Sequence, residues 1–458
     1  MFLKRRSLIE KFDKILYLPI EIHSREFHAK LYLAHQASKR GWVVIIGPEY
    51  DVNKLARYLP AGVYFGNGLH KKAKKISKVL KECGHSIILQ DEEGLVRWVP
   101  QLYKEYRIQS EICNFVDFFL SWGDDDKEII KSAFKKSIKV KAVGNLRFDL
   151  LSPSLRNIFL ENFDDIKKNN DDFILINGNF GSTNHTLGEN YYLNEIEKRG
   201  WLDTPLKKKY QLERVAFQKK IFEKMIKLSI AIARSGQKVI VRPHPSENID
   251  VWKKKTQDYS KNIKIVRSGS IVPWLMAAKV VVHNGCNTAI EGLMLDRIII
   301  SYRPYKNSEV ETYLPNAIST NLETEDEVIK YLRNLDINSS KFQKKEKLEI
   351  LKKYVKINNL QEDASLRILD LIENLFPQKK NTKLQSIKYN ICIELSQLKS
   401  MIGREIYKKN FSYLKKKCPS LDLNQVNKIL DFFSEKKDKN LKLETSKLTK
   451  HSVVISKI

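Results

Sequence analysis

The chain has 458 residues, 42% of them hydrophobic, which is enough for two domains and an extension. Its formal net charge of +28 at pH 7 favours a polyanionic partner, although lysines spread along the chain by composition alone would give the same excess. No apolar run is long enough to cross a bilayer. Five widely spaced cysteines, and a start without the pattern of a signal peptide, indicate a reduced cytoplasm.

The first part of the chain alternates short apolar runs with amphipathic, mostly basic stretches. The runs predict strands at 14–21, 42–48, 62–68, 85–90 and 114–123, and a final strand and loop at 138–151. The stretches between them predict helices at 23–41, 51–59, 70–84 and 124–137. Because this alternation is typical of a parallel, doubly wound sheet, we expect a Rossmann-like domain over residues 1–165.

A second series of the same kind follows a polar linker. It predicts strands at 173–179, 237–247 and 262–269, with helices at 206–235 and 270–279. We therefore expect a second Rossmann-like domain over 172–340, followed by a Lys-rich helical extension over 341–458. Ligands of such α/β folds bind beyond the carboxyl ends of the strands, so the two domains are expected to face a shared cleft.

Residues 280–304 predict a strand-loop-helix-strand unit within this second domain. The unpaired N–H groups and the dipole at the start of a helix attract anions, so a phosphate is the expected ligand. A threonine hydroxyl near the helix start would contact the phosphate, and a glutamate one turn later would accept hydrogen bonds from a ribose. The residues expected to bind the ligand here are His283, Asn284, Gly285, Asn287, Thr288 and Glu291.

Two further loops follow predicted strands and would project into the same cleft. The first contains Glu92 and Glu93; adjacent carboxylates raise one another's pKa, so this pair is the natural general base. The second contains Asn179 and Gly181, which we expect beside the ligand. The ordinary alternative for the acidic pair is a solvated turn.

A third loop holds His244 between two prolines, which stiffen the backbone on both sides of it. With Arg242 and Pro245 it could bind a phosphate, and the histidine could protonate a phosphate leaving group. A lone histidine is more often structural. No metal is expected, because the histidines and carboxylates lack zinc spacing. The acidic run 124–126 predicts the first turn of a helix, with a metal-binding Asp-x-Asp as the alternative.

Six blocks occur in order along the chain: LQDEEGLV, GNLRFDLL, FILINGNFG, VRPHPSEN, PWLMAAKVVVHNGCNTAIEG and ISYRP. Together they resemble the bacterial surface carbohydrate biosynthesis proteins, a group with a glycosyltransferase-B-type fold. The acidic-acidic-Gly and His-Pro stretches are also similar to motifs of bacterial sialyltransferases and Kdo transferases. This resemblance implies that Glu92 is the catalytic base and that His244 contacts the phosphate of a CMP-sugar. The hydroxyl pair of sialyltransferases appears here only as Asn287 and Thr288.

The resemblance implies a glycosyltransferase of surface polysaccharide, lipopolysaccharide or capsule biosynthesis. It would move a Kdo-like or sialic-acid-like sugar from a CMP donor, a co-substrate rather than a cofactor, to a glycan or glycolipid acceptor. A covalent route through Asp149 stays open. The enzyme would work in the cytoplasm at the inner face of the membrane, where its charge fits peripheral association with anionic lipid, and no nucleic acid partner is expected. Two alternatives remain: a nucleotide-sugar epimerase of the same fold, and a non-catalytic protein that binds polyanions or scaffolds polysaccharide assembly.

Overall fold

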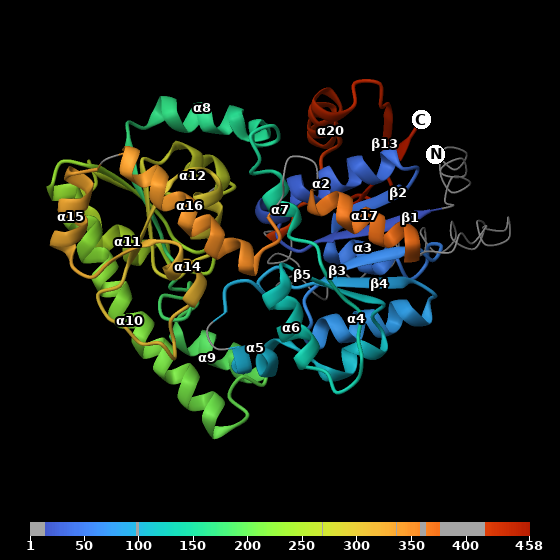
Figure 1. The fold of residues 1–458 in the computed structure, drawn as a ribbon, viewed down its shortest axis with the longest axis horizontal. Coiled ribbons are helices and arrows are strands. Elements are labelled where there is room, and N and C mark those ends of the chain that lie inside the picture. Colours follow the sequence, from blue (N-terminus) through green and yellow to red (C-terminus); the bar gives the residue numbers. More distant parts are fainter. Residues whose placement is uncertain (1–13, 98–99, 268, 336, 358–362, 376–416) are drawn as a thin grey trace. The chain divides into compact units, whose positions relative to one another are not determined.

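The computed structural model describes residues 14–97, 100–267, 269–335, 337–357, 363–375 and 417–458. The chain forms two compact units, each with its own sheet (Figure 1). The first unit consists of Met1–Glu93, Arg107–Ile158 and Val355–Ile458, and the second of Gly94–Tyr106 and Phe159–Tyr354.

The sheet of the first unit has eight strands in the order β13-β14-β2-β1-β3-β4-β5-β6. Neighbours among β1 to β6 pair in parallel, whereas β14 runs antiparallel to both β2 and β13. Every residue of β1 and β2 is buried, as expected for parallel strands covered on both faces. The strands are β1 Ile15–Ile20, β2 Val43–Pro48, β3 Val63–Asn67, β4 Ser86–Gln90, β5 Phe118–Ser121, β6 Val140–Ala142, β13 Leu443–Lys447 and β14 Val453–Lys457.

The helices of this unit include α2, which follows β1 and begins without a capping side chain at Ile22. Glu26 replaces the cap, because its carboxylate accepts hydrogen bonds from the N–H groups of residues 21 and 22 at 3.2 and 3.1 Å. Burial opposes ionisation of Glu26, but Lys30 and Arg25 hold its pKa at about 2. The helices are α2 His23–Lys39, α3 Glu49–Leu55, α4 Lys71–Glu82, α6 Asp124–Ser132, α7 Leu146–Asp149, α17 Ala364–Leu375 and α20 Leu423–Lys437.

The C-terminal part of the chain is built into the first unit. Buried Asp149 accepts hydrogen bonds from the N–H groups of Ala364 and Ser365, each at 2.9 Å, and from the Ser365 hydroxyl at 2.6 Å. This long-range cap fixes the start of α17, and burial raises the pKa of Asp149 to about 7. The contacts give Asp149 a structural place in the fold, whereas its covalent role stays a prediction.

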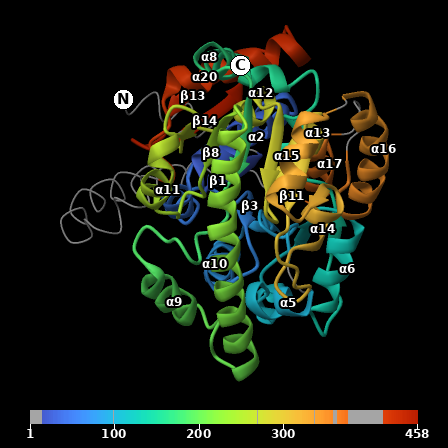
Figure 2. The same ribbon diagram turned by 90° about the vertical axis from the view of Figure 1, so that its left-hand side faces the viewer.

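The sheet of the second unit has six strands in the order β12-β11-β10-β7-β8-β9, all paired in parallel. The long helix α10 begins at a Thr204 cap with Pro205 in its first turn, and it packs against β8, β9 and α11 (Figure 2). The strands are β7 Phe173–Asn177, β8 Lys238–Arg242, β9 Ile263–Ile265, β10 Val280–His283, β11 Ile298–Tyr302 and β12 Thr320–Leu322. The helices are α5 Pro100–Arg107, whose last residue lies in the first unit, and α8 Leu160–Asn169, α9 Glu189–Lys198, α10 Pro205–Arg234, α11 Ile249–Thr256, α12 Val272–Ala277, α13 Thr288–Met294, α14 Tyr313–Ala317, α15 Glu325–Arg333 and α16 Ile337–Tyr354.

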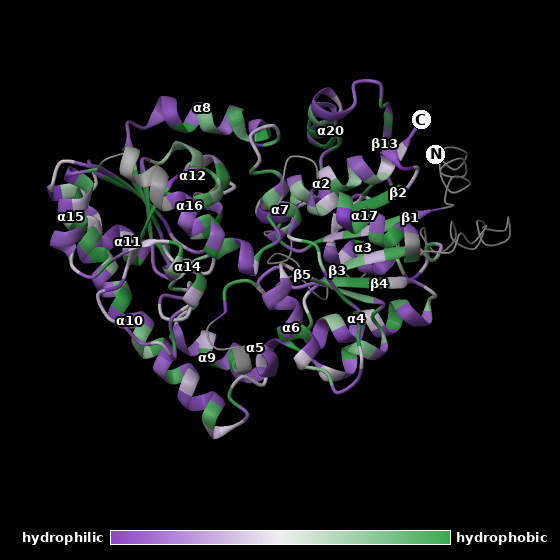
Figure 3. Ribbon diagram, in the orientation of Figure 1, coloured by the Kyte–Doolittle hydropathy of each residue, from purple (hydrophilic) through white to green (hydrophobic). Residues whose placement is uncertain are grey.

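The predicted α/β class with two Rossmann-like domains is confirmed. The units differ from the predicted divisions 1–165, 172–340 and 341–458, because Val355–Ile458 returns to the first unit and Gly94–Tyr106 joins the second. The extension contains helices α17 and α20, but also the hairpin β13–β14, which was not predicted. Hydrophobic residues concentrate in the two sheets (Figure 3), and no helix within the described ranges is long and apolar enough to cross a membrane. The shared cleft stays a prediction.

The Asp149 cap predicts a large effect of Asp149→Ala on stability. The substitution leaves two buried N–H groups of α17 without an acceptor, so the free energy of unfolding should fall by about 2 kcal/mol or more. Urea denaturation followed by circular dichroism measures this. Asp370→Ala, on the exposed side of the same helix, should change it by less than about 0.5 kcal/mol. Equal stability of the two variants would contradict the cap.

Candidate functional site

Four loops of the second unit lie at the carboxyl ends of the adjacent parallel strands β11, β10, β7 and β8. Parallel strands end at the same edge of a sheet, so residues 303–312, 284–287, 178–188 and 243–248 share that edge. Three of these loops contain the residues singled out in the sequence. The fourth, which follows β11, was missed because its mixed charges match no motif.

The buried carboxylate of Glu247 joins two of these loops. Its Oε1 accepts hydrogen bonds from the N–H groups of His244 at 2.7 Å and Phe180 at 3.1 Å, and its Oε2 accepts one from the Trp252 indole at 2.9 Å. A Cβ atom on Gly178 would lie 2.6 Å from Oε1, so the close approach requires glycine. Burial raises the pKa of Glu247, while these hydrogen bonds oppose the rise.

His244 is exposed and its ring orientation is set by Ser246. The ring Nδ1 accepts a hydrogen bond from the Ser246 N–H at 3.2 Å and lies 2.7 Å from the Ser246 hydroxyl. A nitrogen that accepts from a backbone N–H carries no proton itself, so the neutral ring is protonated on Nε2. A Cβ atom on Gly181 would lie 2.1 Å from the same hydroxyl, which explains the glycine. The exposed Pro245 follows the histidine in the same loop, and Asn179 lies in the loop after β7.

Arg242 is largely buried at the end of β8. It donates a hydrogen bond to the Gly269 carbonyl at 3.0 Å, and its guanidinium lies 5.3 Å from the centre of the Trp274 ring. Burial lowers its pKa to about 10, so it stays charged at neutral pH. These contacts place Arg242 as a support of the loop, and its contact with phosphate stays a prediction.

His283 is fully buried beneath the loop that follows β10. Its Nδ1 accepts a hydrogen bond from the Gly285 N–H at 3.0 Å, so its Nε2 donates to the Ser319 hydroxyl at 2.8 Å. Burial lowers the pKa of His283 to about 3, so the ring is neutral. Asn284 donates to the Tyr302 carbonyl at 3.0 Å. The side chains of His283 and Asn284 therefore fix the shape of the loop from its buried side. Any contribution they make to ligand binding would act through Gly285.

The loop around Gly285 contains buried polar atoms that lack partners. Gly285 has a φ of 68°, and a Cβ atom there would lie 2.4 Å from the Thr312 hydroxyl. That hydroxyl and the Asn287 side-chain oxygen are buried without a hydrogen-bond partner. Thr288 begins α13, a helix of only seven residues, and its hydroxyl is also buried without a hydrogen-bond partner. Burial raises the pKa of the nearby Cys286 thiol. Glu291 is buried in the same helix, so its contact with a ribose stays a prediction.

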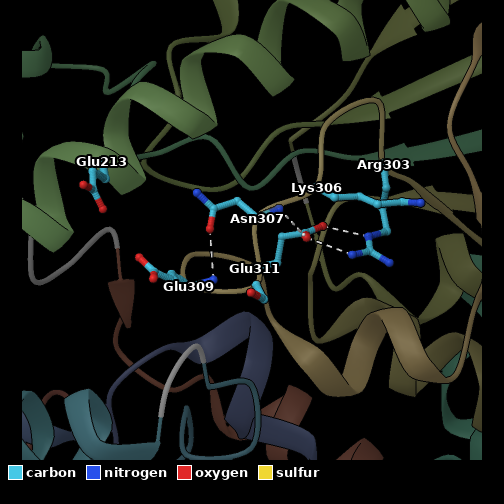
Figure 4. A pocket seen from close by; sticks show the side chains of 7 residues that line it. Glu213, Arg303, Lys306, Asn307, Glu309 and Glu311 are labelled. Atoms are coloured by element: carbon cyan, nitrogen blue, oxygen red, sulfur yellow. Dashed lines mark hydrogen bonds and ion pairs between the residues drawn. The ribbon is translucent and has the colours of Figure 1, made fainter.

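A hollow of 640 Å³ opens beside the loop that follows β11 (Figure 4). Arg303 and Glu311 form a bidentate ion pair at 2.7 and 2.8 Å, and Glu311 also accepts from the Asn307 N–H at 2.9 Å. Lys306 pairs with Glu323. These contacts give the loop a defined shape. The lining is polar and consists of Glu213, Arg303, Lys306, Asn307, Ser308, Glu309 and Glu311.

The acidic loop of the first unit follows β4. Glu92 is buried, its carboxylate lies 3.3 Å from the Arg147 guanidinium, and Asn145 donates to the same oxygen at 3.3 Å. The Arg107 guanidinium donates two hydrogen bonds of 2.7 Å to the carboxylate of Asp91, the residue before Glu92.

Glu93 is exposed and lies beside two arginines. Burial opposes ionisation of its carboxyl, but Arg107 and Arg25 lower the pKa. The acids of the loop are thus paired with arginines, and the loop is not a solvated turn. The role of Glu92 and Glu93 as a base stays a prediction.

The acidic run 124–126 forms the first turn of α6, as predicted, and Asp126 accepts a hydrogen bond from the Trp122 N–H at 3.0 Å. No group of three or more His, Cys, Asp or Glu side chains in the described part of the chain is arranged to hold a metal.

Neither a protein-family model nor a curated protein sequence matches the chain. Among solved structures, a variant of the wall teichoic acid polymerase TagF soaked with CDPG is 13% identical, with a TM-score of 0.50 over 81% of this chain and 92% of that chain. A putative UDP-N-acetylglucosamine 2-epimerase from Listeria monocytogenes is 12% identical, with a TM-score of 0.47 over 81% of this chain and 99% of that chain. At such identities the likeness shows the fold alone, and the polymerase confirms the glycosyltransferase-B-type class.

The position of Glu247 predicts that Glu247→Ala loosens both loops at once. Two buried donors and one partly buried donor lose their acceptor, so the free energy of unfolding should fall by about 3 kcal/mol. In hydrogen exchange, the N–H groups of Phe180 and His244 should exchange faster than in the parent. Glu223→Ala, which removes an exposed carboxylate on α10, should change neither property. Unaltered exchange in Glu247→Ala would contradict this account of the loops.

Proposed function

We propose that the protein is a glycosyltransferase that uses a nucleotide-activated sugar donor. The observation that carries the proposal is the loop pair fixed by Glu247, which presents His244 at the carboxyl edge of the second sheet. Ligands of open α/β sheets bind beyond that edge. The fold is that of a polymerase whose structure was determined after a soak with CDPG, which supports a nucleotide donor.

In the proposed donor site, His244 binds the phosphate that leaves. Its proton on Nε2 can be donated to a phosphate oxygen, because Ser246 occupies Nδ1. As the bond between the anomeric carbon and the phosphate oxygen breaks, that oxygen gains negative charge, and the hydrogen bond strengthens. The positive charge of Arg242, buried at the end of β8 just before this loop, favours this change at longer range.

The loop around Gly285 is proposed to bind another part of the donor. The Thr312 hydroxyl and the Asn287 oxygen are buried without partners, and native proteins seldom leave such groups unpaired. Donor groups bound after a small shift of this loop would provide the partners. The neighbouring hollow offers Asn307, Lys306 and Glu309 to sugar hydroxyl or carboxylate groups, so we assign the sugar to it.

Glu92 is the proposed general base. It would take the proton of an acceptor hydroxyl while the hydroxyl oxygen forms a bond to the anomeric carbon and the nucleotide phosphate departs with the bonding electrons. Arg147 and Asn145 hold the Glu92 carboxylate in one position, and this fixed placement supports the role. We further propose a CMP-linked Kdo-like or sialic-acid-like donor, and a glycan or glycolipid acceptor at the cytoplasmic face of the membrane.

The donor site predicts selective loss of nucleotide affinity in His244→Ala. Loss of a charge-assisted hydrogen bond should weaken binding by about 10-fold or more. Calorimetric titration with CMP, CDP, UDP and GDP measures this. His185→Ala, in the loop after β7 where the ring stacks on Tyr191, is the matched control. If His244→Ala bound nucleotide as tightly as the parent, His244 would not be a phosphate-binding residue. If the parent bound UDP but neither CMP nor CDP, the proposal of a cytidine nucleotide in the donor would be wrong.

The base assignment predicts that Glu92→Gln separates binding from chemistry. The amide keeps the size of the side chain but cannot accept the proton, so transfer should slow by about 10² or more while nucleotide affinity stays unchanged. The rate is measured as the nucleotide released from the donor in the presence of the acceptor. Glu93→Gln removes one negative charge from the same loop and is the control for that change of charge. Full activity of Glu92→Gln would end its role as base, and sugar epimerisation without acceptor would favour an epimerase.

A further inference from the structure

A pair of antiparallel helices in the second unit exposes apolar side chains beside basic ones. Helices α9 and α10 are joined by a short loop, and contacts of Tyr192 with Arg214 and of Glu189 with Lys219 set them side by side. Figure 2 shows the first part of α10 extending beyond the sheet. We call residues 198–212 the hairpin tip. Within it, Leu206 is 64% exposed and Leu212 46% exposed.

The two leucines lie on the outward face of α10. At about 100° per residue, Leu206 and Leu212 are about 120° apart around the helix, and Lys209 lies between them. Tyr210 and Gln211 are buried on the opposite face. The outward face therefore places two exposed leucines next to lysines, the combination found on helices that lie at a membrane surface.

The hairpin tip is strongly basic and its aromatic residues hold it in place. Between residues 198 and 209 the chain has five basic residues and one acidic residue. Of these, Lys198 pairs with the exposed Glu195 at 3.1 Å and Lys209 lies 3.8 Å from Glu213. Trp201 packs on Tyr106 of α5 with 5.3 Å between ring centres, and the Tyr106 hydroxyl donates to the Lys207 carbonyl at 3.3 Å. The tip is thus braced against its own unit, so binding would not have to order it.

We propose that the hairpin tip binds the surface of an anionic lipid bilayer. Leu206 and Leu212 would enter the headgroup region while Lys198, Lys208 and Lys209 contact anionic headgroups. The excess of positive charge favours this partner over a second copy of the chain, because two basic tips would repel each other. This surface lies outside the Lys-rich extension, and the inference does not depend on the proposed sugar transfer.

Sedimentation with vesicles tests the proposal. Full-length protein should bind phosphatidylcholine vesicles that contain phosphatidylglycerol, bind pure phosphatidylcholine weakly, and release in high salt. The variant with Leu206→Glu and Leu212→Glu, and the variant with Lys208→Glu and Lys209→Glu, should each lose affinity about 10-fold or more. Lys253→Glu with Lys254→Glu on α11 makes the same change of charge away from the tip and should lose less than about 2-fold.

Far-ultraviolet circular dichroism and the urea midpoint of the same samples show whether the variants remain folded, and nucleotide titration of the parent tests the donor site separately. Equal losses in the tip and α11 lysine variants would overturn the proposal, because binding would then follow net charge alone. Parent-like vesicle binding by the leucine variant would also overturn it. Dimers of the parent that the leucine substitutions dissociate would show a second copy as the occupant instead. Vesicle binding without any nucleotide binding would leave this inference standing and remove the proposed donor site.

Discussion

The buried carboxylate of Glu247 is the interaction on which the candidate site depends. It accepts hydrogen bonds from two loops that follow different strands, and a third from an indole on α11. A buried acceptor with several donors is costly to disturb, so the loops behave as one body. Ser246 then turns the His244 ring and leaves the proton on Nε2. One glutamate and one serine thus decide which chemical group the edge of the sheet presents.

In the first unit, too, charged side chains hold a loop in a fixed shape. Arginines pair with each acid of the loop after β4, which fixes the position of the Glu92 side chain. The C-terminal segment contributes to this unit through the Asp149 cap and through β14, which pairs with β2. Because β2 would otherwise be an open edge, the hairpin β13–β14 also protects the parallel strands from pairing with other chains.

The sequence was most informative where a signal is local. Continuous apolar runs predicted the buried strands, and polar or glycine residues after them predicted the loops at the strand ends. Contacts between distant residues could not be predicted, since no local pattern links Asp149 to Ser365 or Glu247 to Phe180. Chemistry alone also could not distinguish a buried, neutral His283 from an exposed His244, because burial depends on the packed fold. Glu247 could have been noticed only by its place three residues after His244.

The most direct test of this account is the tautomer of His244 in solution. Two-bond ¹H–¹⁵N correlation spectra of histidine-labelled protein, assigned with His244→Ala, distinguish a proton on Nε2 from one on Nδ1. The account predicts a neutral ring with its proton on Nε2, and a change of the Nε2 shift when a cytidine nucleotide is added. A ring protonated on Nδ1, or a spectrum that the nucleotide leaves unchanged, would contradict it.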